Sequence, residues 1–427
     1  MRLFLSVLSL LILGSLPLMA QKNCATQDYL QQQLQQDPSL LVKYQRADAI
    51  TSNHLHNEII SGATGGSNGQ LPVIKIPVVI HVVYNTSDQN ISEAQIRSQI
   101  EVMNKEFRLQ HADTNKIPSA FRSLAADTYI EFALATVTPK GYATNGIVRK
   151  KTDRYMYGMD DKIKFSSTGG DEAWDSDKYL NIWVGNLVSG VIGYSSVFGG
   201  PKEKDGIVVL YSAFGNTGKL SGTYTKGRTV IHELGHWMGL RHIWGDITCG
   251  NDGIDDTPMQ KAATRGCPSG VLPSCNNEAT GAMYNNYMDL TNDECMNMFT
   301  IGQMQKMRAS FASEGPHAAL SHSNAASAIP LPEPATPVVN PEVSPLIKLY
   351  PNPAQSNITI DISSQENLIG QNLTIHNQLG QQVLTVKLSQ LQTRVNLQQL
   401  KEGIYFVRIG QQTKPYKLLK TGSVINP

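Results

Sequence analysis

The stretch from Thr229 to His242, TVIHELGHWMGLRH, constrains the fold more than any other part of the chain. His232 and His236 are four residues apart, so on a helix both imidazoles project from one face and can bind one cation. Gly239 lets the backbone leave that helix abruptly and bring His242 round as a third ligand. Three protein ligands leave a fourth position open for water, as in a catalytic zinc site.

Glu233 follows the first histidine of this motif. Its carboxylate is expected to accept a proton from zinc-bound water and to pass it to a leaving amine, while the metal lowers the pKa of the water to about 7 and polarises the carbonyl. A helix with incidental histidines is the alternative. The full spacing H-E-x-x-H-x-x-G-x-x-H favours zinc-dependent hydrolysis.

Residues 1–20 have the pattern of a secretory signal peptide. Arg2 precedes an apolar run from Leu3 to Leu18, and the segment closes on Leu-Met-Ala. The run is too short for a convincing membrane span, and we expect no transmembrane anchor elsewhere. A lipoprotein is not favoured, because Cys24 follows Gln-Lys-Asn rather than small residues. We therefore expect an exported protein.

The length and charge of the chain limit its organisation and its partners. A chain of 427 residues is too long for one ordinary core, so two or three folded units are expected. The formal net charge is +1, which provides no field for a polyanion and argues against nucleic acid as a partner. Residues 21–70 are polar, Gln-rich and interrupted by glycines, which fits a removable pro-segment.

Order is predicted to begin at Val73. The β-branched run that follows, to Tyr84, is typical of a strand buried on both faces. Ser92 and Gln95 predict a capping box before an amphipathic helix. Further strands are predicted over 128–137, 179–184 and 207–211.

The segment GVIGYSSVF, residues 190–198, is apolar but interrupted by glycine and serine. Small residues in a strand let an extended peptide approach and pair with its backbone. An ordinary edge strand explains these residues equally well.

The composition changes twice in the C-terminal part of the chain. Residues 318–345 are rich in Ala, Ser and Pro, and predict an extended spacer. Residues 346–427 contain short strands at regular spacing with turns between them, which predicts a small all-β sandwich.

Four of the five cysteines follow the zinc motif closely: Cys249, Cys267, Cys275 and Cys295. Export permits disulfides, and spacing alone leaves three pairings open. Cys24 is left over.

Several separated motifs together resemble one family. LNIWV, GVIGYS, HELGHWMGLRH, DDTP, NNYMD and FTIGQ occur in this order, and the combination resembles the pappalysin (cytophagalysin-like) family of metzincin zinc peptidases over Val73–Ser313. The resemblance implies an α+β catalytic domain over 71–317, with a twisted mixed sheet, an active-site helix and a loop-rich lower subdomain. It implies a secreted zinc endopeptidase that acts on proteins and peptides. A non-catalytic surface adhesin on the same scaffold is the rival, against which the retained Glu233 argues.

The same resemblance implies further site features. Asn286-Tyr287-Met288-Asp289 looks like the metzincin methionine turn, with Met288 beneath the zinc. The implied disulfides are Cys249–Cys275 and Cys267–Cys295. The implied substrate-pairing strand contributes Gly190, Val191, Ile192, Gly193 and Tyr194.

Acidic residues after the motif suggest a structural calcium site. Oxygen ligands of the kind that calcium prefers are offered by Asp252, Asp255, Asp256 and Thr257. A solvated acidic turn is the alternative.

Two positions near the methionine turn bear on catalysis and specificity. Leu290 stands where several metzincins have a tyrosine that assists the reaction, so we assign no oxyanion-stabilising residue. Asp293 and Glu294 follow, where related enzymes form the pocket for the residue after the cut. A carboxylate there, with Glu294 as the candidate, would favour Arg or Lys, and exposed loop acids are the alternative.

Cys24 has a candidate role in latency. By the family resemblance, its thiolate occupies the open zinc position until the pro-segment is removed, which makes the precursor a zymogen. An unpaired cysteine without function is the alternative.

The terminal domain resembles the type A sorting domain of type IX secretion in Bacteroidetes, through LYPNPA, GQQV and LKEGIYFVRI. The implied partner is that secretion machinery, and the implied route runs through the periplasm and outer membrane to the cell surface or medium. A carbohydrate- or matrix-binding module is the alternative, which would need more exposed aromatic residues. We expect a monomer.

Overall fold

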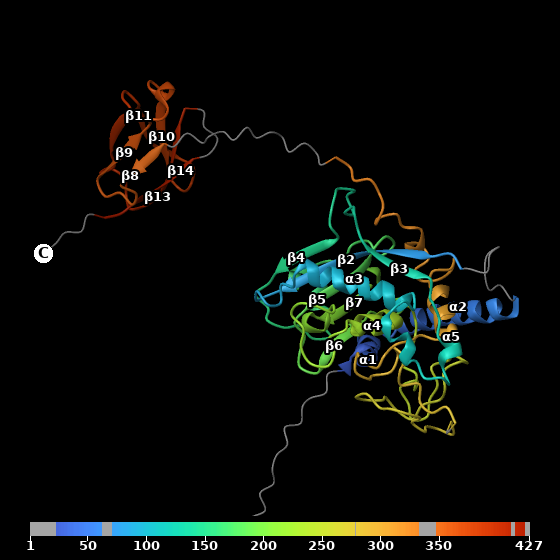
Figure 1. The fold of residues 1–427 in the computed structure, drawn as a ribbon. Helices are drawn as coiled ribbons and strands as arrows, with labels where there is room; N and C mark the ends of the chain where they lie inside the picture. The colour runs from blue at the N-terminus through green and yellow to red at the C-terminus, as the bar shows by residue number, and fades with distance from the viewer. Residues whose placement is uncertain (1–22, 62–70, 278, 333–346, 411–414, 423–427) are drawn as a thin grey trace, which may run out of the picture. The chain divides into compact units, whose positions relative to one another are not determined.

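The structure is a computed structural model that describes residues 23–61, 71–277, 279–332, 347–410 and 415–422 (Figure 1). The predicted signal peptide and the Pro-rich part of the predicted linker lie outside these residues. The chain divides into two compact units, Met1–Glu333 and Pro334–Pro427. None of the helices within the described residues is long and apolar enough to span a membrane.

The N-terminal unit contains five α-helices and seven strands within the described residues. The helices are α1 (Thr26–Gln36), α2 (Leu40–Ser61), α3 (Glu93–Phe107), α4 (Arg228–Trp237) and α5 (Ile301–Ala309). The strands are β1 (Asn23–Cys24), β2 (Ile74–Tyr84), β3 (Ile130–Leu134), β4 (Ile147–Lys151), β5 (Leu180–Gly185), β6 (Val191–Ser195) and β7 (Ile207–Leu210).

These strands form one mixed sheet in the order β1-β6-β7-β5-β2-β3, with β4 pairing to the second half of β2. Strand β2 is central because its continuous apolar run can be buried on both faces, and eight successive residues from Ile76 to Val83 are buried. Strand β6 is antiparallel to β7, whereas the pairs formed by β2 are parallel. The mixed sheet, with α4 carrying the histidine motif, confirms the predicted α+β class.

Helix α3 begins as the sequence predicts but is capped differently. The Ser92 side chain accepts a hydrogen bond from the Gln95 backbone N–H at 3.1 Å. The Gln95 amide does not return to Ser92; it donates to the carbonyls of Tyr211 and Phe214. The predicted capping box is therefore half formed, because this glutamine instead fixes the loop that leads from β7 toward the zinc motif.

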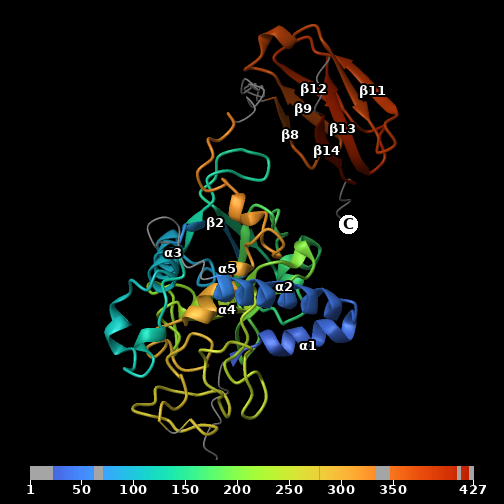
Figure 2. The same ribbon diagram turned by 90° about the vertical axis from the view of Figure 1, so that its right-hand side faces the viewer.

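Residues 23–61 pack on the surface of the rest of the N-terminal unit. Strand β1 pairs with β6, and α1 packs on β6. Helix α2 packs on α5, and Figure 2 shows these two helices together. The buried residues Ala25 and Tyr29 belong to one apolar cluster with Tyr194 and Val208 of the mixed sheet. A polar segment without a core of its own is stabilised in this way by the neighbour that it covers.

The predicted linker boundary at residue 318 is wrong. Leu320 and Ala325 are buried, at 1% and 3% exposure, within cores of the N-terminal unit. The Ala325 carbonyl accepts hydrogen bonds from the backbone of Thr136 and Val137. Small residues in an Ala/Ser-rich segment can pack closely, and the chain therefore stays on the catalytic unit to at least Leu331.

The C-terminal unit is a small all-β sandwich, as predicted. Its two sheets have the orders β11-β10-β13-β14 and β12-β9-β8. Alternating apolar residues such as Ile358, Ile360, Leu373 and Ile375 form the core between them. The strands are β8 (Lys348–Tyr350), β9 (Asn357–Asp361), β10 (Asn372–His376), β11 (Gln382–Lys387), β12 (Gln392–Asn396), β13 (Gly403–Ile409) and β14 (Tyr416–Lys420).

Candidate active site

The three histidines of the motif converge on one point. His232 and His236 lie on α4, and His236 Nε2 is 3.1 Å from His232 Nε2 and 3.2 Å from His242 Nε2. Nitrogen ligands about 2.0–2.1 Å from a tetrahedral zinc ion stand about 3.3–3.4 Å apart. The three nitrogens therefore have close to the spacing that zinc requires.

Each imidazole is held by its other nitrogen. His232 Nδ1 lies 2.6 Å from the Tyr287 carbonyl oxygen, and His236 Nδ1 lies 2.9 Å from the Leu240 carbonyl oxygen. His242 Nδ1 lies 2.6 Å from the Asp246 carboxylate. An N–H donated from Nδ1 leaves the Nε2 lone pair free for a metal. Burial, with the neighbouring His242, lowers the pKa of His232 to about 3, which keeps this ligand neutral.

A turn and a methionine complete the site floor. Gly239 has φ +90°, a conformation that favours glycine, and it lies two residues after Trp237, where α4 ends. Its turn brings His242 back toward the helix. Met288 is fully buried, and its Sδ lies only 2.4 Å from where a Cβ on Gly235 would stand. The absence of a side chain at Gly235 is what allows the methionine turn to pack against α4.

Cys24 joins the three histidines. The Cys24 sulfur and the ring nitrogens of His232, His236 and His242 all lie within 4.8 Å of one another. Burial and the charge of Glu233 raise the pKa of the Cys24 thiol well above its usual value. A divalent cation bound among these four residues would reverse this effect, because it stabilises the thiolate.

Glu233 is enclosed by residues of the predicted pro-segment. Its Oε2 accepts a 2.7 Å hydrogen bond from the Thr26 hydroxyl and lies 3.7 Å from the Cys24 sulfur. Its Oε1 is buried without a partner among the described residues. Burial raises the pKa of Glu233 to about 7, against the lowering effect of the contacts with Thr26 and Cys24.

Strand β6 provides the edge with which β1, in the predicted pro-segment, pairs. Asn23 pairs with Val191 and Cys24 with Gly193 in parallel register. Ala25 N–H donates to the Gly193 carbonyl at 2.9 Å. Among the predicted pairing residues, Val191, Ile192, Gly193 and Tyr194 lie on β6, whereas Gly190 is in the preceding turn.

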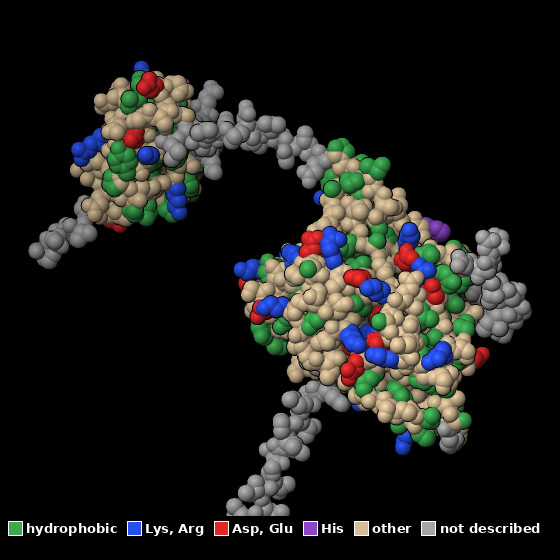
Figure 3. Space-filling view, in the orientation of Figure 1, with side chains coloured by type: hydrophobic (Ala, Val, Ile, Leu, Met, Phe, Trp, Pro, Cys, Tyr) green, Lys and Arg blue, Asp and Glu red, His purple; other side chains and the backbone are tan. Residues whose placement is uncertain are grey.

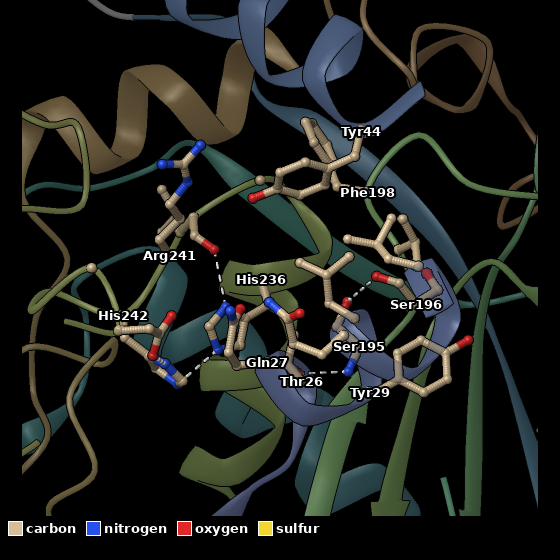
Figure 4. A pocket seen from close by; sticks show the side chains of 18 of the residues that line it. Thr26, Gln27, Tyr29, Tyr44, Ser195, Ser196, Phe198, His236, Arg241 and His242 are labelled. Atoms are coloured by element: carbon tan, nitrogen blue, oxygen red, sulfur yellow. Dashed lines mark hydrogen bonds and ion pairs between the residues drawn. The ribbon is translucent and has the colours of Figure 1, made fainter. Parts of the chain in front are cut away.

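Two cavities flank the histidine cluster. The first, of about 290 Å³, is lined by His236, His242 and Arg241 together with residues of α1 and α2 such as Thr26 and Tyr44 (Figure 4). The second is narrow and lies beside His232. Its lining includes Tyr224, Thr229, Leu290, Asp293 and Met296.

The acid in the narrow cavity is Asp293, not Glu294. Glu294 is exposed and stands beside the Cys267–Cys295 disulfide, so the structure does not place this predicted residue in the pocket. Asp293 is 1% exposed and its Oδ1 has no partner in the part of the chain that the structure describes. Burial raises its pKa to about 6, although backbone N–H groups of Lys226 and Arg228 hydrogen-bond to it.

Sequence reasoning missed a buried polar network behind this pocket. Arg228 pairs with Glu106 at 3.0 Å and donates to the Asp293 carbonyl at 2.6 Å. Glu106 also accepts a hydrogen bond from the Tyr287 hydroxyl. The Tyr287 carbonyl holds His232, so the network connects the pocket acid with a predicted metal ligand. Glu106 lies over one hundred residues before the motif, and no local pattern in the sequence indicates the pairing.

The predicted calcium residues are not gathered into a carboxylate cluster among the described residues. Both Asp256 oxygens accept hydrogen bonds near the start of α5, from the Thr300 hydroxyl and the Gly302 N–H. Asp252 is buried, bonds the Thr257 hydroxyl through Oδ1, and leaves Oδ2 without a partner within the described chain.

The lower part of the unit is held by two disulfides. Their pairing is Cys249–Cys275 and Cys267–Cys295, as the family resemblance implies. They connect loops that contain few hydrogen-bonded elements of their own, which matches a loop-rich subdomain.

Two family models match the chain. The model described as pregnancy-associated plasma protein-A matches residues 164–312, and a secretion system C-terminal sorting domain matches residues 348–420. An extracellular metalloprotease of Arthroderma benhamiae is 29% identical over 258 residues, which cover 58% of this chain and 75% of that protein.

Solved structures also match. Tannerella forsythia mature mirolysin in complex with a cleaved peptide is 46% identical with a TM-score of 0.57, over 59% of this chain and 97% of that one. A promirolysin mutant from the same organism is 39% identical with a TM-score of 0.61, over 70% of this chain and 96% of that one.

Proposed function

This chain belongs to the pregnancy-associated plasma protein-A (pappalysin) family of metallopeptidases and is a secreted zinc metalloendopeptidase, and we propose that Glu233 is its general base and that residues 21–70 keep it latent. The observation that carries the proposal is the convergence of three Nε2 atoms beside a buried carboxylate. The metalloprotease relatives weigh against the alternative of a non-catalytic adhesin.

His232, His236 and His242 would hold the zinc ion, which when bound supplies Lewis acidity to the scissile carbonyl and lowers the pKa of its water. Glu233 receives the proton of the attacking water and delivers it to the leaving amine. Its position supports this role, because the carboxylate lies 3.7 Å from the Cys24 sulfur, whose place beside the three histidines a water would take once residues 21–70 are removed. Val191 to Ser195 provide an edge that can pair with an extended substrate.

Latency is proposed from three contacts of the pro-segment. Cys24 would take the fourth metal position, the Thr26 hydroxyl occupies a Glu233 oxygen, and β1 covers the pairing edge of β6. A substrate cannot use any of these groups while the segment is in place. The larger share of this chain matched by promirolysin than by mature mirolysin supports the proposal.

We propose Asp293 as the residue that selects Arg or Lys after the scissile bond. Its unpartnered, buried oxygen faces a narrow cavity beside His232, where a cationic side chain would satisfy it. Calcium at Asp252 and Thr257, with Asp255 or Asp256 nearby, remains a structural proposal that rests on the unpartnered Asp252 oxygen. The sorting domain is proposed to engage type IX secretion machinery.

The test of the proposed activity uses the full chain after its pro-segment has been removed. Casein and a quenched peptide that contains one arginine are incubated with the unmodified chain and with Glu233→Gln. The proposal expects cleavage before arginine, with a loss of at least about 10³-fold in kcat for the variant while one zinc per chain is retained. Undiminished activity of Glu233→Gln would refute the assigned base.

A further inference from the structure

Two cations of the catalytic unit share one carboxylate of the pro-segment. Asp48, on α2, accepts a hydrogen bond from Lys306 Nζ through Oδ1 at 2.8 Å, and one from Arg241 Nη2 through Oδ2 at 2.6 Å. Lys306 lies on α5, and its side chain is only 2% exposed. The counter-ion of a buried lysine therefore belongs to a segment that we propose is removed.

Arg241 connects this pair with the reaction centre. It directly precedes His242 in the chain and lines the same 290 Å³ cavity as His236 and His242 (Figure 4). The narrow cavity with Asp293 lies instead beside His232. If Asp293 receives the residue after the cut, the cavity with Arg241 receives the residues before it.

Removal of α2 leaves both cations without Asp48. Within the described residues, no other acceptor lies within hydrogen-bond distance of Lys306 Nζ, and Arg241 Nε is buried with no partner. Asp252 is an acid whose charge interacts with those of both Arg241 and Lys306. Its Oδ1 is engaged by the Thr257 hydroxyl and its Oδ2 has no partner within the described residues, so it forms an ion pair with neither cation there. The site then presents a guanidinium and an ammonium group with the spacing of a single bidentate carboxylate.

We propose that Arg241 and Lys306 form a carboxylate-binding subsite of the activated protease, which selects substrates with Asp or Glu in the segment before the scissile bond. The inference rests on the proposed peptidase function and on loss of the pro-segment. A guanidinium forms the stronger, directional hydrogen bonds to a carboxylate, and the lysine adds a second positive charge. Asp48 occupies the same two groups in the precursor, so the pro-segment also blocks substrate recognition.

The experiment compares pairs of quenched peptides that are cleaved at one arginine and differ only by Glu or Gln. The substitution is placed at one of the positions two to six residues before the cut. The full chain is activated by limited digestion with an added serine protease, which is then inhibited. At one or more positions, kcat/KM for the Glu peptide is expected to exceed that for the Gln peptide about fivefold or more, and to fall toward equality in high salt.

Variants assign this preference to the two cations. Arg241→Gln and Lys306→Met should each bring the Glu-to-Gln ratio toward 1, and Arg241→Glu should make a Lys peptide better than a Glu peptide. Lys202→Gln is the matched control, because Lys202 forms an exposed pair with Asp177, and it should keep the ratio. Because Lys306 is buried, its variant is compared only if its thermal unfolding is cooperative; Arg241, with a side chain 40% exposed, tests the site independently.

A ratio near 1 at all positions in the unmodified protease overturns the inference, as does a ratio that Arg241→Gln leaves unchanged. These outcomes differ from failure of the proposed function, in which neither member of any peptide pair is cleaved.

Discussion

Thr26 offers a test of how the pro-segment holds the site closed. Its hydroxyl donates to Glu233 Oε2 at 2.7 Å and accepts from the Ser195 N–H at 2.9 Å, so it joins the general base to the substrate-pairing edge. Thr26→Val keeps the shape of the side chain and removes both hydrogen bonds. In this buried setting, the loss of a hydrogen bond to a charged group costs about 1.5–3 kcal/mol, and an unpaired Ser195 N–H adds about 1–3 kcal/mol.

The expected consequence is a larger open fraction of the uncleaved precursor. A total of about 3 kcal/mol corresponds to about a hundredfold change in the docking equilibrium of the pro-segment. The assay is hydrolysis of a quenched peptide by intact precursor, checked by gel for the absence of processing. We expect activity to increase by about one to two orders of magnitude, even though Cys24 is retained.

Thr51→Val is the matched control for this change. Within the part of the chain that the structure describes, the Thr51 hydroxyl donates only to carbonyls of its own helix α2, those of Ala47 and Asp48. Its precursor should stay latent. A Thr26→Val precursor that is no more active than the unmodified precursor would show that the hydroxyl contributes nothing to closure.

Three further outcomes are expected. First, burial raises the pKa of Asp293 to about 6, so its carboxyl becomes protonated and neutral as the pH falls through 6. The preference of the activated protease for Arg over Met after the cut, measured as the ratio of kcat/KM for the two peptides, should decline over that range. Asp293→Asn should show a small ratio that does not change with pH. Second, Glu106→Ala leaves Arg228 buried without this partner and should destabilise the N-terminal unit by about 3–5 kcal/mol, measured as a lowered midpoint of thermal unfolding. Glu101→Ala on the same helix removes only an exposed ion pair and should change the midpoint little. Equal midpoints for the two variants would contradict the role of the network. Third, Cys24→Ala precursor should hydrolyse peptide without processing, and a fully latent variant would remove Cys24 from the closure mechanism.

The strands with a regular pattern of apolar residues and the residues of the zinc motif could be predicted from the sequence. The continuous β-branched run of β2 and the alternating strands of the terminal sandwich have patterns that follow directly from burial on two faces or on one. The three histidines of the zinc motif are fixed by helix geometry and by the turn at Gly239. Charges of both signs are interspersed on the face of the N-terminal unit that Figure 3 shows, in keeping with a net charge of +1.

Features that depend on contacts between distant segments could not be predicted. The choice of Asp293 over Glu294 depends on which side of one turn faces inward, because adjacent residues point in different directions. The partners of Arg228 and Asp48 lie far away in the chain, and the sequence carries no local signal for them. The continued packing of residues 318–331 was missed because Ala and Ser are common both in spacers and in close packing.

Zinc titration tests the central claim most directly. The activated chain is freed of metal with a chelator, and peptide hydrolysis is measured as zinc is added back. The account predicts that activity returns linearly and saturates at one zinc ion per chain, and that His242→Ala shows neither this saturation nor more than a trace of activity. Full hydrolysis by the metal-stripped chain, or recovery of His242→Ala at the same single equivalent of zinc, would contradict the account.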